Sequence, residues 1–221
     1  MSATSILNLK QNINLLTPSL SPSCDYYSDA DFLEGSERLG SVDRLSIFHL
    51  NIRSLNANNA KLFQFMAGLN FPFDIIILSE IWAYNISSYS KLFPNYTFFY
   101  SLPINSMIGG VGAFVSDSLS AVKRDDLELI NDIQDYSAEY MFLDLIKNNS
   151  HYLIGCFYRH PSGNISEFCM GLENLFQSQL FRKCRSPCFL AGDFNIDLLK
   201  YDLQNDVTNF LDILVNYIFC R

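Results

Sequence analysis

The sequence predicts an α/β protein in which packed mixed β-sheets are covered by helices. Short apolar stretches rich in β-branched and aromatic residues recur along the chain, and segments with helical spacing of apolar residues lie between some of them. The middle strands follow one another with only short turns between them. That order is not a strict strand–helix–strand repeat, so we expect mixed sheets of the α+β type rather than one parallel sheet.

The first 43 residues differ from the rest of the chain. They are rich in Ser, Asn, Leu and Asp, they contain Pro18 and Pro22, and they show no sustained period of 2 or 3.6 residues. We therefore expect residues 1–43 to form a flexible leader and residues 44–221 to form one domain.

Regular elements are expected from Leu45 onward. A short strand over residues 45–50 is followed by a helix over residues 56–69, which Pro72 ends. The run Asp74–Leu78 is almost continuously apolar, which is typical of a strand buried on both faces. Further strands are expected at 96–100, 111–115, 140–146, 152–157 and 188–191, and further helices at 165–181 and 208–218.

Composition and charge limit the class of function. Hydrophobic residues make up 49% of the 221 residues and charged residues 17%, which is enough apolar material for a sizeable core. The net charge of -8 argues against a protein that binds nucleic acid by bulk electrostatics, because phosphate neutralisation needs clustered cations. It does not argue against an enzyme that meets phosphate through a divalent metal ion held by carboxylates.

The cysteines and the hydropathy pattern indicate a compartment. None of the six cysteines forms a CxxC pair, so a zinc site is not expected, and reduced thiols in an intracellular protein are. There is nothing like a signal peptide, and no apolar run approaches the roughly 20 residues that span a bilayer. We therefore expect a nuclear or cytoplasmic protein that is neither secreted nor in a membrane.

Polar side chains follow several of the expected strands. Asn51 follows the first strand, Glu80 follows the run that ends at Ser79, and Asp193 and Asn195 follow residues 189–192. Three such strand ends that converge would form an oxygen-rich site suited to Mg²⁺. Taken singly, each acidic residue is more typical of a turn or a helix cap.

The amino-acid sequences of these segments are more specific than their positions at strand ends. The segments LNIRSL (50–55), SEIW (79–82), YRHP (158–161) and AGDFNID (191–197) occur in this order. With them the chain resembles the DNase I-like endonuclease/exonuclease/phosphatase superfamily, and in particular the endonuclease domain of LINE-type non-LTR retrotransposons. The resemblance extends from about residue 45 to the C-terminus. It implies a four-layer α/β sandwich of two packed mixed sheets flanked by helices, with the C-terminal part missing.

The resemblance also implies an activity, which is Mg²⁺- or Mn²⁺-dependent hydrolysis of a phosphodiester in DNA. Glu80 would be the carboxylate ligand of the metal ion, with Asn51 beside it. Tyr158 would contact the scissile phosphate, Asp193 would position or deprotonate the attacking water, and Asn195 would donate a hydrogen bond to the phosphate. In the parent element the domain would be fused to a reverse transcriptase. The oligomeric state stays open.

The sequence departs from the family pattern in its last part. The closing ID-x-I strand and Ser-Asp-His motif of the family do not occur in the 221 residues, so we expect weak or no nuclease activity from this chain. Two alternatives stay open: a phosphatase or phosphodiesterase of the same fold, and a non-catalytic remnant or domesticated binding module. Glu139 is either a supporting site residue or a surface residue, and His160 is expected to be exposed rather than catalytic.

Overall fold

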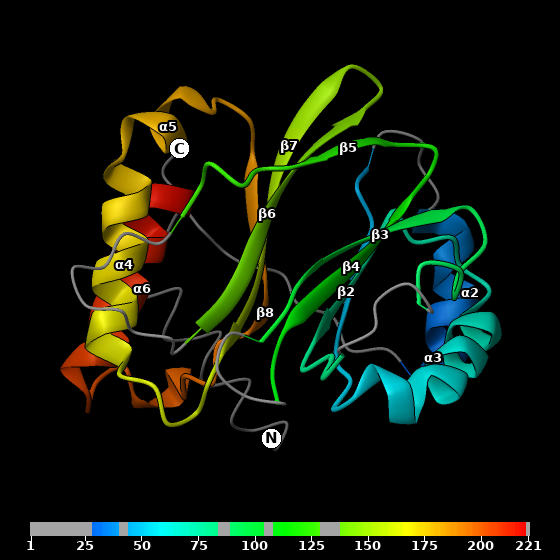
Figure 1. Ribbon diagram of the computed structural model, residues 1–221, viewed down its shortest axis with the longest axis horizontal. Coiled ribbons are helices and arrows are strands. Elements are labelled where there is room, and N and C mark those ends of the chain that lie inside the picture. The colour runs from blue at the N-terminus through cyan, green and yellow to red at the C-terminus, as the bar shows by residue number, and fades with distance from the viewer. Residues whose placement is uncertain (1–27, 40–43, 84–88, 104–107, 129–137, 220–221) are drawn as a thin grey trace.

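The described part of the chain folds into four layers. It comprises residues 28–39, 44–83, 89–103, 108–128 and 138–219 of a computed structural model. Helices α2 (Asp29–Leu39) and α3 (Leu55–Leu69) cover one sheet, a second sheet packs on its other side, and α4 (Ile165–Gln177), α5 (Gln179–Lys183) and α6 (Asn205–Leu214) cover that second sheet (Figure 1). The predicted sandwich of two mixed sheets flanked by helices is thereby confirmed.

The first sheet has the strand order β1-β2-β4-β3. Its strands are β1 (Ile47–Asn51), β2 (Ile75–Ser79), β3 (Tyr96–Ser101) and β4 (Val111–Ser116). β1 pairs parallel with β2, and β4 pairs antiparallel with both β2 and β3. The parallel pair requires a crossover connection, which α3 provides on the outer face of the sheet.

The second sheet has the order β5-β6-β7-β8. Its strands are β5 (Ser120–Lys123), β6 (Ala138–Lys147), β7 (Ser150–Arg159) and β8 (Cys188–Asp193), and only β7 and β8 are parallel. β5 has no counterpart among the predicted strands, because its four residues carry no sustained apolar alternation. The parallel pairs of the two sheets end at the same edge, the lower one in Figure 1.

Alternation along the strands divides the core into separate layers. In β2, Ile76 and Leu78 pack toward α3, whereas Ile75 and Ile77 pack toward the second sheet. All five β2 residues are buried, as the continuous apolar run predicts. Each such Ile or Leu contributes about 1.5–3 kcal/mol through removal of apolar surface from water, so β2 anchors both layers at once.

The helices on the outer face of the second sheet differ in detail from the predicted ones. The single helix expected over residues 165–181 is wrong at Ser178, where the backbone is extended (φ -60°, ψ 148°). The Ser178 hydroxyl accepts from the N–H of Phe181 at 3.2 Å and so caps a new helix, α5. The helix expected over residues 208–218 is present as α6, which begins at Asn205 and continues as a π-helical turn over Val215–Phe219.

Helix α2 lies within the predicted leader, so the expectation of no regular structure there is wrong for residues 29–39. Ser28 and Asp31 cap its start reciprocally, through Asp31 N–H to Ser28 Oγ (3.2 Å) and Ser28 N–H to Asp31 Oδ2 (3.1 Å). Phe32 anchors the helix against Phe71 and Phe73, with ring centroids 5.6 and 6.0 Å apart. Phe32 supplies these aromatic contacts, and a single anchoring residue gives the sequence little periodicity. Residues 1–27 and 40–43 lie outside the described residues.

The state of the cysteines and the hydropathy of the helices bear on the expected compartment. Cys156, Cys169, Cys184 and Cys188 are free thiols, while Cys24 and Cys220 lie outside the described residues. Burial raises the pKa of the Cys156 thiol to about 12. Within the described ranges, none of the helices combines the length and the apolar character that a membrane crossing requires.

A buried carboxylate ties the two sheets together at the edge opposite to the ends of the parallel strands. Asp74, just before β2, accepts from the N–H and the hydroxyl of Ser46 at 2.7 and 2.8 Å. Its Oδ2 also accepts from Lys147 Nζ, at the end of β6 in the other sheet, at 2.8 Å. Lys147 donates in addition to the carbonyl of Arg44 at 2.6 Å, so both charges are compensated.

We expect Asp74→Ala to lower the free energy of unfolding by about 3 kcal/mol, because it leaves the largely buried Lys147 without its counter-charge. The measurement is urea unfolding followed by circular dichroism. Asp117→Ala is the matched control and should cost less than about 1 kcal/mol, since Asp117 is exposed and accepts from the Thr97 hydroxyl. Equal losses in the two variants would contradict the role of Asp74 as a tie between the sheets.

Candidate active site

Four of the five predicted site residues stand at the ends of the two parallel strand pairs. Asn51 is the last residue of β1, Glu80 follows β2, and Asp193 is the last residue of β8. Tyr158 in β7 is the register partner of Asp193. Strands that run parallel end at one edge of their sheet, and the packing of the sheets places both edges together.

The amide nitrogen of Asn51 joins the two halves of the site. It donates to Glu80 Oε1 and to Asp193 Oδ2, each at 2.7 Å. Asn51 and Asp193 are 142 positions apart in the sequence, so this contact exists only because the sheets pack face to face. Two carboxylates on one nitrogen repel each other, and a cation between or beside them would relieve that repulsion.

The donor set of this cluster fits a hard divalent cation. The side-chain oxygen Oδ1 of Asn51 is buried and has no hydrogen-bond partner among the described residues, although an unpaired buried oxygen is costly. Beside it stand the carboxylates of Glu80 and Asp193, so every donor here is oxygen. The described residues include no group of three His, Cys, Asp or Glu that could hold a metal. Mg²⁺ commonly binds one or two carboxylates and retains several waters.

Tyr158 is a neutral hydrogen-bond donor in this acidic surrounding. Its side chain is 3% exposed. Burial raises the pKa of its phenol to about 12, with smaller contributions from the charges of Glu80, Glu139 and Asp193 and from a hydrogen bond to Glu80. The hydroxyl therefore keeps its proton at any pH near neutrality and can donate a hydrogen bond to an anionic ligand.

Asp193 is held on both oxygens. Its Oδ1 accepts from the backbone N–H of Asn195 at 3.1 Å, while Oδ2 accepts from Asn51. Asn195 has a left-handed backbone (φ 48°), and its side-chain nitrogen donates to the carbonyl of Arg159 at 2.7 Å. Asn195 therefore meets the cluster through its backbone, while its side chain fixes the loop that follows β8.

Arg159 holds the same loop through hydrogen bonds, a role that the sequence alone did not predict. The side chain is 1% exposed. Its guanidinium donates to the carbonyls of Phe194 (2.7 Å), Asn195 (2.7 Å) and Gly163 (2.6 Å). The one available signal was an arginine at the end of the otherwise apolar run 153–158, where a buried cation needs backbone or acidic partners.

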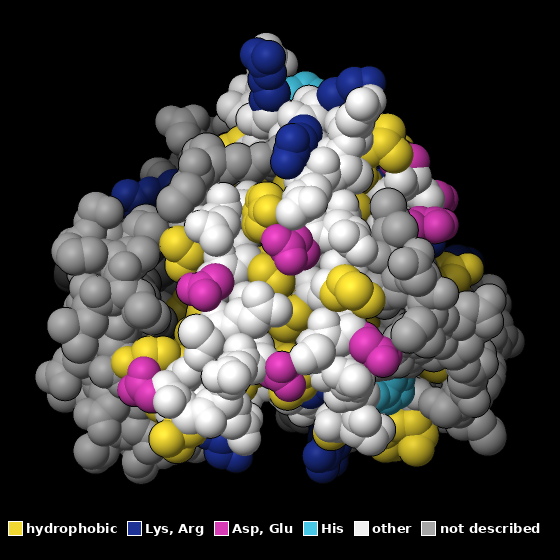
Figure 2. Space-filling model, turned by 90° about the vertical axis from the view of Figure 1, so that its left-hand side faces the viewer, with side chains coloured by type: hydrophobic (Ala, Val, Ile, Leu, Met, Phe, Trp, Pro, Cys, Tyr) yellow, Lys and Arg dark blue, Asp and Glu magenta, His cyan; other side chains and the backbone are white. Residues whose placement is uncertain are grey.

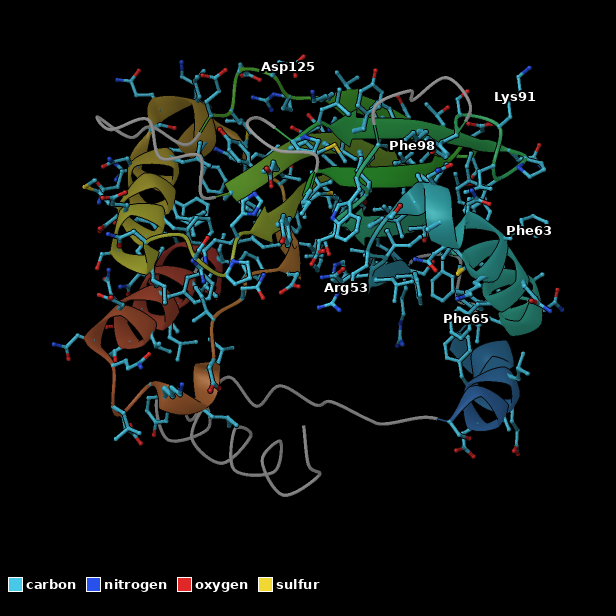
Figure 3. All side chains as sticks on the ribbon, turned by 60° about the horizontal axis from the view of Figure 1, so that its bottom comes forward. Arg53, Phe63, Phe65, Lys91, Phe98 and Asp125 are labelled. Atoms are coloured by element: carbon cyan, nitrogen blue, oxygen red, sulfur yellow. The ribbon has the colours of Figure 1, made fainter. Side chains whose placement is uncertain are left out.

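The loops that carry Asn51 and Glu80 run side by side beyond the strands. Ile52 N–H donates to Ser79 O (3.0 Å), Ser54 N–H to Glu80 O (2.8 Å) and Leu55 N–H to Ile81 O (2.8 Å). Arg53, Ser54, Glu80 and Trp82 all have positive φ, between 46° and 81°. Non-glycine residues adopt this conformation at a cost, and such strain is concentrated at functional sites. Figure 3 shows Arg53 at this edge, between α3 and the end of β8.

Two residues beside Tyr158 differ from their expected surroundings. His160, expected to be exposed, is 22% exposed at its side chain, and its Nε2 lies 2.8 Å from Glu139 Oε1. Its ring packs edge-on against the Tyr158 ring, with centroids 4.8 Å apart. Glu139 is 2% exposed, so the interpretation of it as a surface residue is wrong. Neither position could be read from the sequence, because the two residues meet across the β6–β7 pair.

His49 lies in β1, two residues before Asn51. Its Nε2 is 3.1 Å from the Ser79 hydroxyl in the neighbouring strand. Burial lowers the pKa of His49, and the charge of Asp193 opposes this only in part. This histidine is thus a neutral, half-buried neighbour of the cluster, as its place in a strand predicts.

Comparisons with known proteins identify a family and several solved structures of similar fold. The model of the Endonuclease/Exonuclease/phosphatase family matches residues 48–221. The endonuclease domain of TRAS1, a telomere-specific non-LTR retrotransposon, is similar in structure with a TM-score of 0.56 and 14% identity, over 78% of this chain and 72% of that one. A comparison with curated proteins finds no match.

Two further solved structures share the fold. Mannosyl-6-phosphatase Bt3783 of Bacteroides thetaiotaomicron has a TM-score of 0.55 and 14% identity, over 76% of this chain and 70% of that one. D. rerio TDP2, complexed with a single-strand DNA product, has a TM-score of 0.51 and 15% identity, over 75% of this chain and 64% of that one. At such identities the likeness shows the fold alone.

Gly192 sets the approach of β8 to β7 and hence the position of Asp193. A Cβ at Gly192, where φ is 152°, would lie 1.9 Å from the carbonyl oxygen of Phe157. We expect Gly192→Ala to destabilise the protein by about 3 kcal/mol or more in urea unfolding, because backbone must move. Gly68→Ala in α3 meets nothing within 4 Å and should instead stabilise it by about 0.5–1 kcal/mol. Tolerance of Gly192→Ala would contradict the close approach.

The raised pKa of Tyr158, about 12, predicts a pH dependence of stability. The folded state binds this proton more tightly than the unfolded state, whose tyrosines titrate near pH 10. The resulting stabilisation is complete below about pH 10 and is lost as the pH rises toward 12. In urea unfolding, the stability difference between the wild type and Tyr158→Phe should be constant below about pH 10 and shrink above it. A difference that stays constant up to pH 12 would show that the phenol is not buried among carboxylates.

Proposed function

The chain belongs to the endonuclease/exonuclease/phosphatase family, and on that premise we propose that its cluster of Asn51, Glu80, Tyr158, Asp193 and Asn195 hydrolyses a phosphodiester of DNA with the help of Mg²⁺ or Mn²⁺. The observation that carries this proposal is the amide of Asn51. Its nitrogen donates to Glu80 and Asp193 from the two sheets, and its buried oxygen has no partner among the described residues. Structural support of the fold alone would not require two carboxylates on one nitrogen.

Glu80 and Asn51 would hold the metal ion, Glu80 through its carboxylate and Asn51 through Oδ1. The buried, unpartnered state of Oδ1 supports this role, because a cation would satisfy an oxygen that no described donor reaches. When bound, the ion would neutralise charge on the non-bridging oxygens of the phosphate. The left-handed backbone of Glu80 (φ 55°) keeps its side chain at the sheet edge.

Asp193 would position and deprotonate the attacking water. Its two oxygens accept from Asn51 Nδ2 and Asn195 N–H, which fix the orientation of the carboxylate. A carboxylate oxygen has two lone pairs, so each oxygen can accept a further hydrogen bond from a water molecule. A base held at this accuracy contributes about 10²- to 10⁴-fold to such a reaction.

Tyr158 and Asn195 would donate to the phosphate as charge develops on it. The Tyr158 phenol keeps its proton, and its single O–H donates to Glu80 in this structure. When a metal ion takes the Glu80 carboxylate, that O–H would be released to donate to the phosphate. Asn195 uses one amide hydrogen for the carbonyl of Arg159, and an amide nitrogen carries a second. A preorganised donor of this kind is worth about 10²- to 10³-fold in turnover.

DNA as the substrate agrees with the charges at this edge of the molecule. Arg53 is exposed beside the site and can contact a phosphate of the strand (Figure 3). The helical face formed by α4 and α6 carries acidic side chains across its middle and Lys or Arg toward its upper and lower margins (Figure 2). Contact through the site edge is therefore more favourable than contact through this face, given a net charge of -8.

We also propose that the protein acts in a retrotransposon. This proposal rests on the sequences of the four segments LNIRSL, SEIW, YRHP and AGDFNID, and on the similarity of fold to the TRAS1 endonuclease domain. We propose nicking of DNA as the activity, in an element that also encodes a reverse transcriptase. Phosphomonoester hydrolysis is the second candidate, since Bt3783, described as a mannosyl-6-phosphatase, has the same fold.

We expect weak binding of Mg²⁺ or Mn²⁺ in isothermal titration calorimetry, and loss of the binding heat in Glu80→Gln. We also expect weak Mg²⁺-dependent nicking of supercoiled plasmid by this chain, and its loss to the rate without protein in Glu80→Gln and in Asp193→Asn. Glu128→Gln, a change at an exposed glutamate, is the control and should alter neither readout.

Equal metal binding by the wild type and Glu80→Gln would refute the metal site. Hydrolysis of p-nitrophenyl phosphate without plasmid nicking, lost in Asp193→Asn, would favour the phosphatase alternative.

A further inference from the structure

Glu139 is a buried acid next to the proposed catalytic tyrosine that the chemistry described above does not use. It is the register partner of Tyr158 across the antiparallel β6–β7 pair, so both side chains lie on the same face of the second sheet. Its side chain is 2% exposed. Burial of a carboxylate is costly unless it is paired and hydrogen-bonded, and the partner here is His160, with Nε2 2.8 Å from Oε1.

The second oxygen of Glu139 lies against the turn that precedes β4. A Cβ at Gly109 would lie 2.9 Å from Oε2, so the glycine leaves room for the carboxylate. The carbonyl of Gly109 accepts from Trp82 N–H at 3.0 Å, and that of Gly110 accepts from Ile81 N–H at 3.3 Å. Glu139 thus lies between His160 and the turn that holds the segment following Glu80. Oε2 itself is buried and has no hydrogen-bond partner in the described ranges.

His160 is the link from Glu139 to Tyr158. Nε2 of His160 and Oε1 of Glu139 share one hydrogen bond at 2.8 Å, which fixes the plane of the His160 ring. The ring then meets the Tyr158 ring edge-on, at a centroid distance of 4.8 Å and an interplanar angle of 72°. This is a favourable aromatic geometry, and it restrains the Tyr158 ring on the side of His160.

We propose that Glu139 and His160 are a positioning pair, in which Glu139 orients the His160 ring and that ring holds the Tyr158 phenol toward Glu80 and the scissile phosphate. The inference rests on the proposed function, since it assigns these residues to the placement of its phosphate-binding phenol. Neither residue needs to touch the substrate. Misplacement of a reacting group by about 1 Å can cost on the order of 100-fold in rate, which sets the scale of the expected effect.

The first test reads the Tyr158 ring directly and needs no turnover. The full chain is labelled with ¹³C-ring tyrosine, and the Tyr158 signal is assigned by its absence in Tyr158→Phe. We expect ring order from ¹³C relaxation to fall for Tyr158 in His160→Ala and in Glu139→Ala, because each change removes the hydrogen bond between the two residues. It should stay unchanged for Tyr96, whose hydroxyl donates to the carbonyl of Phe73 at 2.6 Å. His151→Ala, which removes an exposed histidine 3.6 Å from Asp144, should change neither signal. Unaltered Tyr158 order in both variants overturns the proposal.

The second test is a double-mutant cycle in the plasmid-nicking assay. We expect His160→Ala to lower kcat about 10- to 100-fold with little change in KM, and to have less than about a twofold effect when it is combined with Tyr158→Phe. His160→Gln keeps a nitrogen that can donate to Glu139, so it should recover part of the loss. It also serves if His160→Ala proves too unstable in thermal unfolding.

Losses of equal size in the wild-type and Tyr158→Phe backgrounds would overturn the positioning role, because His160 would then act independently of Tyr158. If Tyr158→Phe alone leaves hydrolysis unchanged, the proposed role of Tyr158 fails, while the relaxation measurement still decides whether the pair orders the ring.

Discussion

The packing of the two sheets through one shared apolar layer is the constraint that places every residue of the site. Ile75 and Ile77 of β2 meet Ile154 and Cys156 of β7 in this layer. The same strands carry Tyr158 at their end and Glu80 just beyond it, so the distance between the sheets fixes the distance between these two candidate site residues. A register slip of one residue would turn the apolar side chains outward and scatter the site, so core and site are specified together.

Within that frame, a small polar network concentrates negative charge at one edge. Asn51 brings Glu80 and Asp193 onto a single nitrogen, and Glu139 adds a third acid, itself buried, behind Tyr158. Burial, and to a smaller extent the charges of these acids, raise the pKa of the Tyr158 phenol and keep it neutral. The backbone at Arg53 and Glu80 is strained at this same edge. The packed core on either side holds these two loops in conformations from which they would relax in isolation.

The segment 158–160 shows how closely chemistry and support are combined. Tyr158 faces the cluster. Arg159 turns to the opposite side and donates to the carbonyls of Phe194 and Asn195 after β8 and to that of Gly163 before α4. His160 lies again on the side of Tyr158 and contacts Glu139. Alternation along a strand explains this division, because successive side chains point to opposite faces. The family relationship supports a hydrolase of this fold, and under the proposed function the choice among phosphate esters would depend on residues around the cluster, such as Arg53.

The sequence by itself determined every strand except β5 and most of the helices, and it predicted the residues that the structure brings together at one edge. Apolar runs such as Asp74–Leu78 and motifs such as GDFNID are local, and local patterns can be read from neighbouring residues. It did not reveal α2, where Phe32 packs on two aromatic rings, or the break at Ser178, where a serine cap competes with helix continuation. Only the tertiary structure decided that Asn51 meets Asp193 and that Glu139 and His160 meet beside Tyr158. Those contacts join residues far apart in the chain, and their energy comes from burial that no single segment can achieve alone.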